Sequence, residues 1–366
     1  MSPIQGANLD GNGIPQDEIK FSQIEKEFGR QPGANNRTIG NYCISNSFGS
    51  LTDVRLDNEA GKNANTPIPG PKGQEVKFSD FYNGKLNVAV DLWSGGGTVK
   101  RAHAKTLYKN KDVKVLGPTP NADAPTWQEM EGRRVIIHVN KKIKSETENT
   151  RSICALRTGS WKSTTKVQLD IGSSGIIYGA GGKGGNGAND ESDTGDGGKN
   201  GNSAIGIQHN GTVVSVMGGA YIQCGFGGGG GGGGGYRSDK GGSERCAGSG
   251  GGGGAGLPAG AKGTGGDSSK TDGNDGNKAT ANTRGTGGAS VDEGNADGGK
   301  GGNGGGINDK GDILNPQDGD DGSNSEGGSA GNNGAAIRKS ASVSWSYAAG
   351  HPLGTVHGST SATGVT

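Results

Sequence analysis

The chain has 366 residues, a formal net charge of +1 at pH 7 and only 28% hydrophobic residues. A charge so close to zero creates no overall field that favours nucleic acid or an anionic membrane surface, so we expect no nucleic-acid partner. The apolar content is too low for one large core, and no stretch approaches the roughly 20 apolar residues of a membrane span. The N-terminus also lacks the pattern of a secretion signal. We therefore expect several domains and no membrane insertion.

Residues 1–85 are predicted to form an irregular attachment segment, because their few apolar residues are scattered among Gly, Asn and Pro. Ser22 and Glu25 form a capping-box pattern and Gly29 fits a helix end, which predicts a short helix at 22–28. The phrase at the start of this helix returns in related form near residue 80. The two phrases are either similar by chance or share a role in clipping the segment onto another protein. The contact residues would then be Phe21, Ile24, Phe28, Phe78, Phe81 and Tyr82.

Residues 86–178 are predicted to form a small β-sandwich-like domain. Residues 86–92 alternate between apolar and polar types, and this period of two is typical of a half-buried strand. Further strands are expected at 111–116, 134–139 and 166–171. Basic residues flank the strand at 134–139. A solvated strand edge, whose charge blocks unwanted sheet pairing, explains them better than a nucleic-acid patch does.

Glycine dominates the rest of the chain, since 63 of the 80 glycines follow residue 170 and Gly227–Gly235 is unbroken. Collagen is excluded because it needs a strict three-residue period and abundant proline, and only Pro258, Pro316 and Pro352 occur here. A flexible linker, a disordered tract and packed polyproline-II-like strands of polyglycine remain. The last is physically sound, because strands without side chains can approach closely and bond sideways through their backbones.

Short apolar strands lead into each glycine-rich excursion and follow it. Residues 176–178 and 221–223 precede two such excursions, and returning strands are expected at 204–207, 212–217 and 342–347. The two re-entry phrases, NGNSAI at 200–205 and NNGAAI at 332–337, match each other. We interpret them as equivalent positions in stacked layers of a short β core that anchors the glycine loops.

The sequence gives little support for catalysis, so we expect no enzyme, no cofactor and no metal. The five histidines are scattered, and neither a GxSxG nor an HExxH pattern is present. Acidic clusters at 190–196 and 318–321 lack known calcium-loop spacings, and solvated loop tips explain them better. The four cysteines form no CxxC pair. A Cys224–Cys246 disulfide is one option, and free thiols are the favoured one.

Recognition of another molecule requires large side chains on rigid loops, and few residues of the glycine-rich half qualify. Tyr236 and Arg237 end the nine-glycine run, where a distal loop is expected, and are the leading candidates. Leu257 and His351 are further candidates. Trp345 and Tyr347 share one face of a strand and are interpreted as core residues.

Residues 176–187, IIYGAGGKGGNG, resemble the opening of glycine-rich domains in phage tail-fibre and adhesin proteins. The Gly-Phe-polyglycine phrase at 225–235 and the closing phrase from Ala335 to Trp345 share this resemblance. The organisation is similar to that of the tip adhesins of T-even-like phages. Those proteins pack glycine-rich motifs as a polyglycine-II sandwich and bind host outer-membrane proteins through distal loops. The phrases around Phe21 and Phe78 resemble segments of phage structural proteins, including those of cyanophages.

The resemblance implies an all-β chain with a virion-attachment segment at 1–85, a β-sandwich-like domain at 86–178 and a polyglycine-II domain with distal loops at 179–366. It implies a tail-fibre or adhesin subunit of the virion that is made in the host cytoplasm. The implied partners are other phage tail or fibre proteins and a host outer-membrane protein or surface polysaccharide. A homotrimer and a single chain on a trimeric shaft both fit. The alternative is a structural virion component, such as a capsid fibre, decoration or baseplate protein, without receptor binding.

Overall fold

The computed structural model describes residues 134–146, 151–190, 192–239 and 242–365, and the backbone of the strands that lie between residues 55 and 116. Throughout these residues every regular element is a β-strand, which confirms the all-β prediction. None of the described residues belongs to a helix that is long and apolar enough to cross a membrane. The helix predicted at 22–28 lies outside the described residues. Three strands, β1 (Arg55–Asn58), β2 (Thr66–Pro67) and β3 (Gly84–Leu86), form a separate antiparallel sheet.

Three larger sheets form the body of the protein. The first contains, in spatial order, β7 (Lys114–Leu116), β4 (Val88–Asp91), β8 (Arg134–Val139), β11 (Lys166–Ile171), β14 (Thr212–Val216) and β23 (Trp345–Tyr347). The second contains β5 (Val99–Lys100), β9 (Lys142–Lys144), β12 (Ile176–Tyr178), β15 (Tyr221–Gln223) and β24 (Thr355–His357). The third contains β6 (Ala102–His103), β10 (Cys154–Arg157), β13 (Ser203–Ile207), β22 (Ile337–Lys339) and β25 (Ala362–Thr363).

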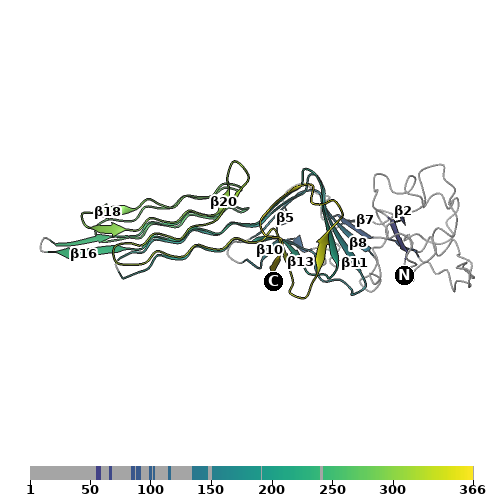
Figure 1. The fold of residues 1–366 in the computed structure, drawn as a ribbon, viewed down its shortest axis with the longest axis horizontal. Helices are drawn as coiled ribbons and strands as arrows, with labels where there is room; N and C mark the ends of the chain where they lie inside the picture. Colours follow the sequence, from purple (N-terminus) through teal and green to yellow (C-terminus); the bar gives the residue numbers. More distant parts are fainter. Residues whose placement is uncertain are drawn as a thin grey trace, which may run out of the picture.

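Apart from β7, which lies in the first sheet just before β8, the strands visit these sheets in a fixed rotation, first, second, third and then first again. Neighbouring strands within each sheet are parallel, apart from the antiparallel pair β4 and β7. A chain that winds in this way builds a three-sided parallel β-helix, in which each coil lies on the one before it. We call this body the β-helix (Figure 1).

Alternating side chains on the three sheets fill the interior of the β-helix. Three apolar side chains of β8 are at most 1% exposed, namely Val135, Ile137 and Val139. They pair in register with three apolar residues of β11, namely Val167, Leu169 and Ile171. Residues from all three sheets join one hydrophobic cluster. Because a fully buried Val or Ile side chain contributes about 1.5–3 kcal/mol, these stacks are the main source of stability in the β-helix.

The stretch 86–178 does not form a β-sandwich of its own. Its strands pair in parallel with strands from beyond residue 200, such as β11 with β14 and β12 with β15. The strands predicted at 134–139 and 166–171 are confirmed as β8 and β11. Their arrangement differs from the prediction because an alternating strand looks the same in a sandwich and in a β-helix.

Both glycine-rich excursions leave the β-helix at the same corner, between its second and third sheets. Residues 179–202 connect β12 to β13, and residues 224–336 connect β15 to β22. We call these two stretches together the glycine lattice, and they extend far to one side of the β-helix (Figure 1). Ile205 and Ile337 are paired in register where the two excursions return. This pairing confirms that the two matching re-entry phrases occupy equivalent positions in stacked layers.

Segment 224–235 is enclosed on all sides within the lattice. The successive N–H groups of Gly228–Gly233 donate to three neighbouring segments in turn, 195–202, 246–256 and 316–322, and then to the same three again. Its carbonyl groups accept bonds from three further segments, 179–188, 299–305 and 326–336. For example, Gly231 N lies 2.9 Å from Asp196 O. With a neighbour opposite every residue, no position of Gly227–Gly235 has room for a side chain.

Among the other lattice segments, those with more neighbouring segments contain more glycine. Segment 246–256 is also enclosed, and its residues Gly250–Gly254 are again an unbroken run. Segment 179–188 lies at the surface of the lattice, where Lys183 and Asn186 interrupt the glycines and are half-buried. A net backbone hydrogen bond is worth about 1 kcal/mol, close to the entropic cost of one glycine. Nearly complete pairing of N–H and C=O groups is therefore what keeps the glycines ordered.

Short hairpins and loops join the lattice segments at both ends. The hairpins β16–β17 (Gly235–Asp239 and Gly242–Cys246) and β18–β19 (Val291–Glu293 and Ala296–Gly298) lie at the end far from the β-helix (Figure 1). The hairpin β20–β21 (Gly306–Ile307 and Ile313–Leu314) lies nearer the β-helix. Phe226 is fully buried with Cys224 and Ala255 where the lattice begins, so one aromatic ring fills the junction.

Candidate functional site

The far end of the lattice gathers the turns that join its outward and inward segments. We call this surface the distal tip, and it consists of the described residues within 189–194, 236–245, 267–272, 291–298 and 323–325. The turns begin and end in lattice segments whose backbones are bonded to several neighbours. The lattice is bonded mainly through backbone groups, so the exposed side chains of these turns can differ in chemistry while the scaffold stays the same.

The hairpin β16–β17 is the largest element of the distal tip. Tyr236 pairs across the hairpin with Arg245, whose guanidinium carbon lies 5.2 Å from the centroid of the tyrosine ring. This distance suits a cation–π contact, which orients both side chains on one face. Arg237 pairs with Glu244 in the backbone register and is exposed. The hairpin therefore presents an aromatic ring beside the Arg245 guanidinium on one face, and Arg237, the next residue of the strand, belongs to the opposite face.

Side-chain hydrogen bonds tie the hairpins to one another. Glu244 Oε2 accepts a bond of 2.8 Å from the backbone N–H of Asn295, in the turn of β18–β19. Asn324 Oδ1 accepts a bond of 2.9 Å from the N–H of Tyr236. Thr271 Oγ1 donates to Glu293 Oε2 at 2.5 Å. Residues that are distant in sequence are thus fixed side by side, and the tip is a cross-linked surface.

Carboxylates surround the arginines of the distal tip. Asp190 is half-buried, and hydrogen bonds from the Ser192 hydroxyl and backbone N–H hold its pKa below its usual value. Arg245 contributes a smaller attraction to the same carboxylate. Asp193, Asp267 and Asp292 are exposed nearby in the turns. The tip thus combines a basic, aromatic hairpin with an acidic rim.

The structure separates the four residues predicted for recognition. Tyr236 and Arg237 lie together on β16 at the distal tip. Leu257 lies at the opposite end of the lattice, where its N–H donates to Gly179 O at 2.8 Å. His351 lies on the β-helix, where its Nδ1 is 3.0 Å from Val216 O. Tyr236 and Leu257 both follow a glycine-rich run, so the sequence predicts a turn at each position. It does not indicate at which end of the lattice each turn lies.

The remaining predicted residues fall into two groups. The residues predicted for attachment, Phe21, Ile24, Phe28, Phe78, Phe81 and Tyr82, lie outside the described residues. Trp345 and Tyr347 are half-buried, form an edge-to-face pair with ring centroids 4.9 Å apart, and pack against the hydrophobic cluster of the β-helix.

The described residues do not bring together three potential metal ligands of the His, Cys, Asp or Glu type. Cys154, Cys224 and Cys246 are buried free thiols, so Cys224 and Cys246 are not bridged, as the sequence favoured. Burial raises the pKa of the Cys224 thiol to about 12 and also raises the pKa of the Cys246 thiol.

Sequence reasoning missed the partners that complete the hairpin. Arg245, Glu244 and Asn324 contact the predicted pair or its turn, yet none stands out in composition. The signal was available for Arg245, because two β-capable stretches on either side of a Lys-Gly-Gly turn predict a hairpin that pairs their residues.

The described residues thus form an all-β scaffold that ends in cross-linked turns. The sequence profile described as "Phage tail fibre adhesin Gp38" matches residues 106–361, which is more than half of the chain. The chain therefore belongs to the Gp38 family of phage tail fibre adhesins. It is a tail-fibre adhesin subunit, a component of the virion tail, in a family whose role is structural and non-catalytic.

Two other comparisons complete this result. None of the curated proteins matches the chain. Among solved structures, the chain is similar to one in the gp37–gp38 adhesin tip complex of the long tail fibre of bacteriophage S16. That match has 20% sequence identity and a TM-score of 0.28, and it covers 78% of this chain and 88% of that chain.

Proposed function

We propose that this adhesin attaches to the host surface through the distal tip. The observation that carries the proposal is the hairpin β16–β17, where Tyr236 stacks with Arg245 and Arg237, the next residue of the strand, is exposed. Tyr and Arg are the residue types that dominate binding energy at protein interfaces, because they offer large contact areas at a low entropic cost. A host outer-membrane protein or a surface polysaccharide is the proposed receptor.

We also propose that the enclosed segments of the lattice are polyglycine-II strands. The support is that successive backbone N–H groups donate to three neighbouring segments in turn and then to the same three again. A strand with three residues per turn, as in polyproline II, gives this pattern. On this view backbone bonds supply the rigidity and the turns supply the specificity. The scaffold can then accept new turns without repacking a core.

We propose that the first 85 residues attach the chain to the rest of the virion. The proposed contact residues are Phe21, Ile24, Phe28, Phe78, Phe81 and Tyr82. The β-helix links this segment to the lattice, and other tail-fibre proteins are the proposed partners. The support is family membership together with the division of labour along the chain, since the distal tip lies at the far end of the lattice. We further propose that the chain is made in the host cytoplasm, in keeping with its buried free thiols.

The experiment is a binding competition with the purified full-length protein. Saturable binding to intact host cells, and inhibition of phage adsorption by the bound protein, are the expected results. The variants Tyr236→Ala and Arg237→Ala should each weaken binding by at least about tenfold, which corresponds to about 1.4 kcal/mol.

The matched control is Lys310→Ala, which removes an exposed charged residue from the β20–β21 hairpin, nearer the β-helix. Its binding should equal that of the wild type. Equal binding by all three variants would remove the distal tip from the proposal. A folded protein that never binds host cells would favour a structural role in the virion, and cleavage of host polysaccharide would show an enzyme.

A further inference from the structure

A second polar site lies at the root of the lattice, beside the third sheet of the β-helix. A cavity of about 540 Å³ opens there between the loop before β10, the returning lattice segment, β22 and β25. We call it the root pocket, and its lining residues are Arg151, Ser152, Asn200, Arg338, Ala362, Thr363 and Gly364. Two of these residues are arginines and none is acidic, so the described part of the lining carries a net positive charge.

Arg338 is held rigidly in the wall of the root pocket, at 7% exposure. Its Nε donates to Ser203 Oγ at 3.0 Å, and its Nη1 donates to the backbone oxygens of Thr363 and Gly364. Those bonds leave the second amino group, Nη2, without a partner among the described residues, and it is not one of their buried unbonded atoms. The guanidinium is therefore fixed in orientation and keeps donors for a ligand.

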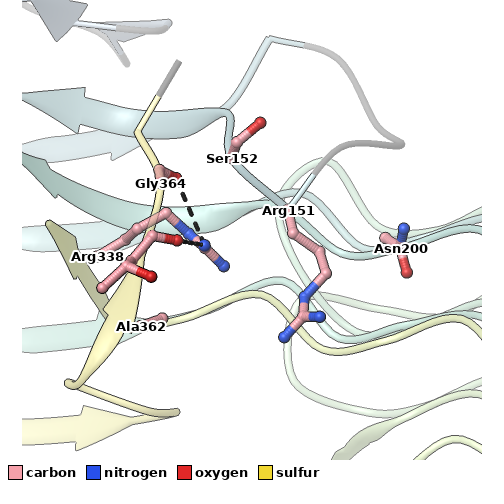
Figure 2. A pocket seen from close by; sticks show the side chains of 7 residues that line it. Arg151, Ser152, Asn200, Arg338, Ala362 and Gly364 are labelled. Carbon is pink, nitrogen blue, oxygen red and sulfur yellow. Dashed lines mark hydrogen bonds between the residues drawn. The ribbon is translucent and has the colours of Figure 1, made fainter. Parts of the chain in front are cut away.

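The hydroxyl of Ser203 organises both arginines. It accepts the bond from Arg338 Nε and donates to the backbone oxygen of Arg151 at 2.7 Å. The side chain of Arg151 is itself held by a bond of 3.1 Å from its Nε to Asn333 O, which leaves both of its terminal amino groups free of any bond to a described residue. Figure 2 shows the two guanidinium groups facing the same open space.

The two positive charges oppose each other in this arrangement. Burial, and to a smaller extent the neighbouring Arg151, lower the pKa of Arg338. An anion placed between the two groups would relieve their repulsion and accept charge-assisted hydrogen bonds from both, the strongest kind of hydrogen bond available to it. Arginine also presents paired donors that match the oxygens of a carboxylate or a phosphate.

We propose that the root pocket binds the carboxylate or phosphate of a small acidic molecule. The volume of the pocket exceeds what a single anionic group needs and falls within the range of ligand sites. An acidic molecule the size of a monosaccharide fits these limits. The site is separate from the distal tip and does not depend on the receptor proposed there.

The test is calorimetric titration of the full-length protein with three probes of similar size, namely glucuronate, glucose 6-phosphate and neutral glucose. At least one acid should bind and glucose should not, and the acid that binds identifies the anionic group. Arg151→Gln should weaken binding by about tenfold or more, since a hydrogen bond to a charged group contributes that much. The control Lys310→Gln, which removes an equal charge from the β20–β21 hairpin, should bind like the wild type.

Arg151→Gln is the primary variant because Arg151 is exposed, whereas Arg338 also anchors β25. Glucose binding equal to acid binding, unchanged affinity in Arg151→Gln, or the absence of acid binding would each overturn the proposal. Glu148, which precedes Arg151 in the sequence, lies outside the described residues. Acid binding that occurs only in Glu148→Gln would show that the chain already neutralises the arginines, and would also overturn it.

Discussion

At the scale of single residues, the structure distinguishes glycines that the lattice requires from glycines that it tolerates. A Cβ atom on Gly231 would overlap the carbonyl oxygen of Asn186, whereas one on Gly197 would meet only Ser329 O at 3.5 Å, an ordinary contact. Gly231→Ala should therefore lower the unfolding free energy by at least about 2 kcal/mol, because the backbones must move apart.

Gly197→Ala is the matched control and should have almost no effect, since Gly197 is exposed and the new methyl group has room. Denaturant unfolding of both variants beside the wild type measures the difference. Equal destabilisation by the two substitutions would contradict the close packing described for segment 224–235.

Three cysteines of the described residues should resist modification in the native protein. Cys154, Cys224 and Cys246 are buried, and the pKa of Cys224, raised to about 12, leaves almost no thiolate at pH 8. We expect alkylation by iodoacetamide to leave these three unmodified until the protein is denatured. Mass spectrometry of the digested protein locates the label, and rapid native labelling of Cys224 would contradict its burial beside Phe226.

At the scale of elements, the repeat of three predicts how lattice segments respond to deletion. Removal of Gly229 alone would turn every later amide in segment 224–235 toward the wrong neighbour, because successive residues bond to different segments. Removal of Gly228–Gly230 would keep each later amide directed at its original neighbouring segment and would shorten segment 224–235 by about 9 Å. The single deletion should therefore lower the melting temperature more than the triple deletion, as differential scanning calorimetry can measure. The reverse order would exclude a three-residue repeat.

The turns of the β-helix contain a pH-sensitive contact at His209. Burial lowers the pKa of its imidazole below 6.5, while its Nδ1 accepts the N–H of Trp161 and its Nε2 donates to Thr165 O at 2.7 Å. The folded protein thus disfavours the proton that the unfolded chain accepts. The stabilising contribution of neutral His209 is therefore fully present above about pH 6.5, and it is lost as the pH falls through the lower folded pKa.

We expect the unfolding free energy of the wild type to fall between pH 7 and pH 5, and to fall less in His209→Gln. Burial also lowers the pKa of His357, so part of the pH dependence will persist in this variant. Denaturant titrations at the two pH values measure both effects. An identical pH dependence in the wild type and the variant would contradict the assigned role of His209.

Individual elements were predictable from the sequence, whereas their assembly was not. Strands β8 and β11 follow from alternation, and the register of Ile205 with Ile337 follows from two matching phrases. Parallel pairing between β11 and β14 could not be predicted, because it depends on long-range contacts that leave no local pattern. The placement of Leu257 and Tyr236 at opposite ends of the lattice could not be predicted for the same reason. Arg338 was missed because a lone arginine after an apolar strand resembles an ordinary edge residue.

At the scale of the whole molecule, the two proposed tasks, host binding at the distal tip and virion attachment through residues 1–85, belong to separate parts of the chain. The distal tip lies beyond the lattice and far from the β-helix (Figure 1). The lattice is a rigid spacer, because its enclosed segments are bonded on every side. Substitutions at the tip therefore cannot disturb the coils of the β-helix through packing, and the two tasks should be separable by mutation.

Phages that carry Arg237→Ala should assemble with a normal amount of the adhesin and adsorb poorly to host cells. Phages that carry Phe78→Ala should contain less adhesin, because Phe78 belongs to the proposed attachment segment. Immunoblots of purified particles measure the adhesin content, and adsorption rates measure host attachment. If Arg237→Ala reduced incorporation, or if Phe78→Ala reduced adsorption at normal adhesin content, the two tasks would share one surface. Separate effects would show that one rigid lattice allows receptor specificity to change while assembly is conserved.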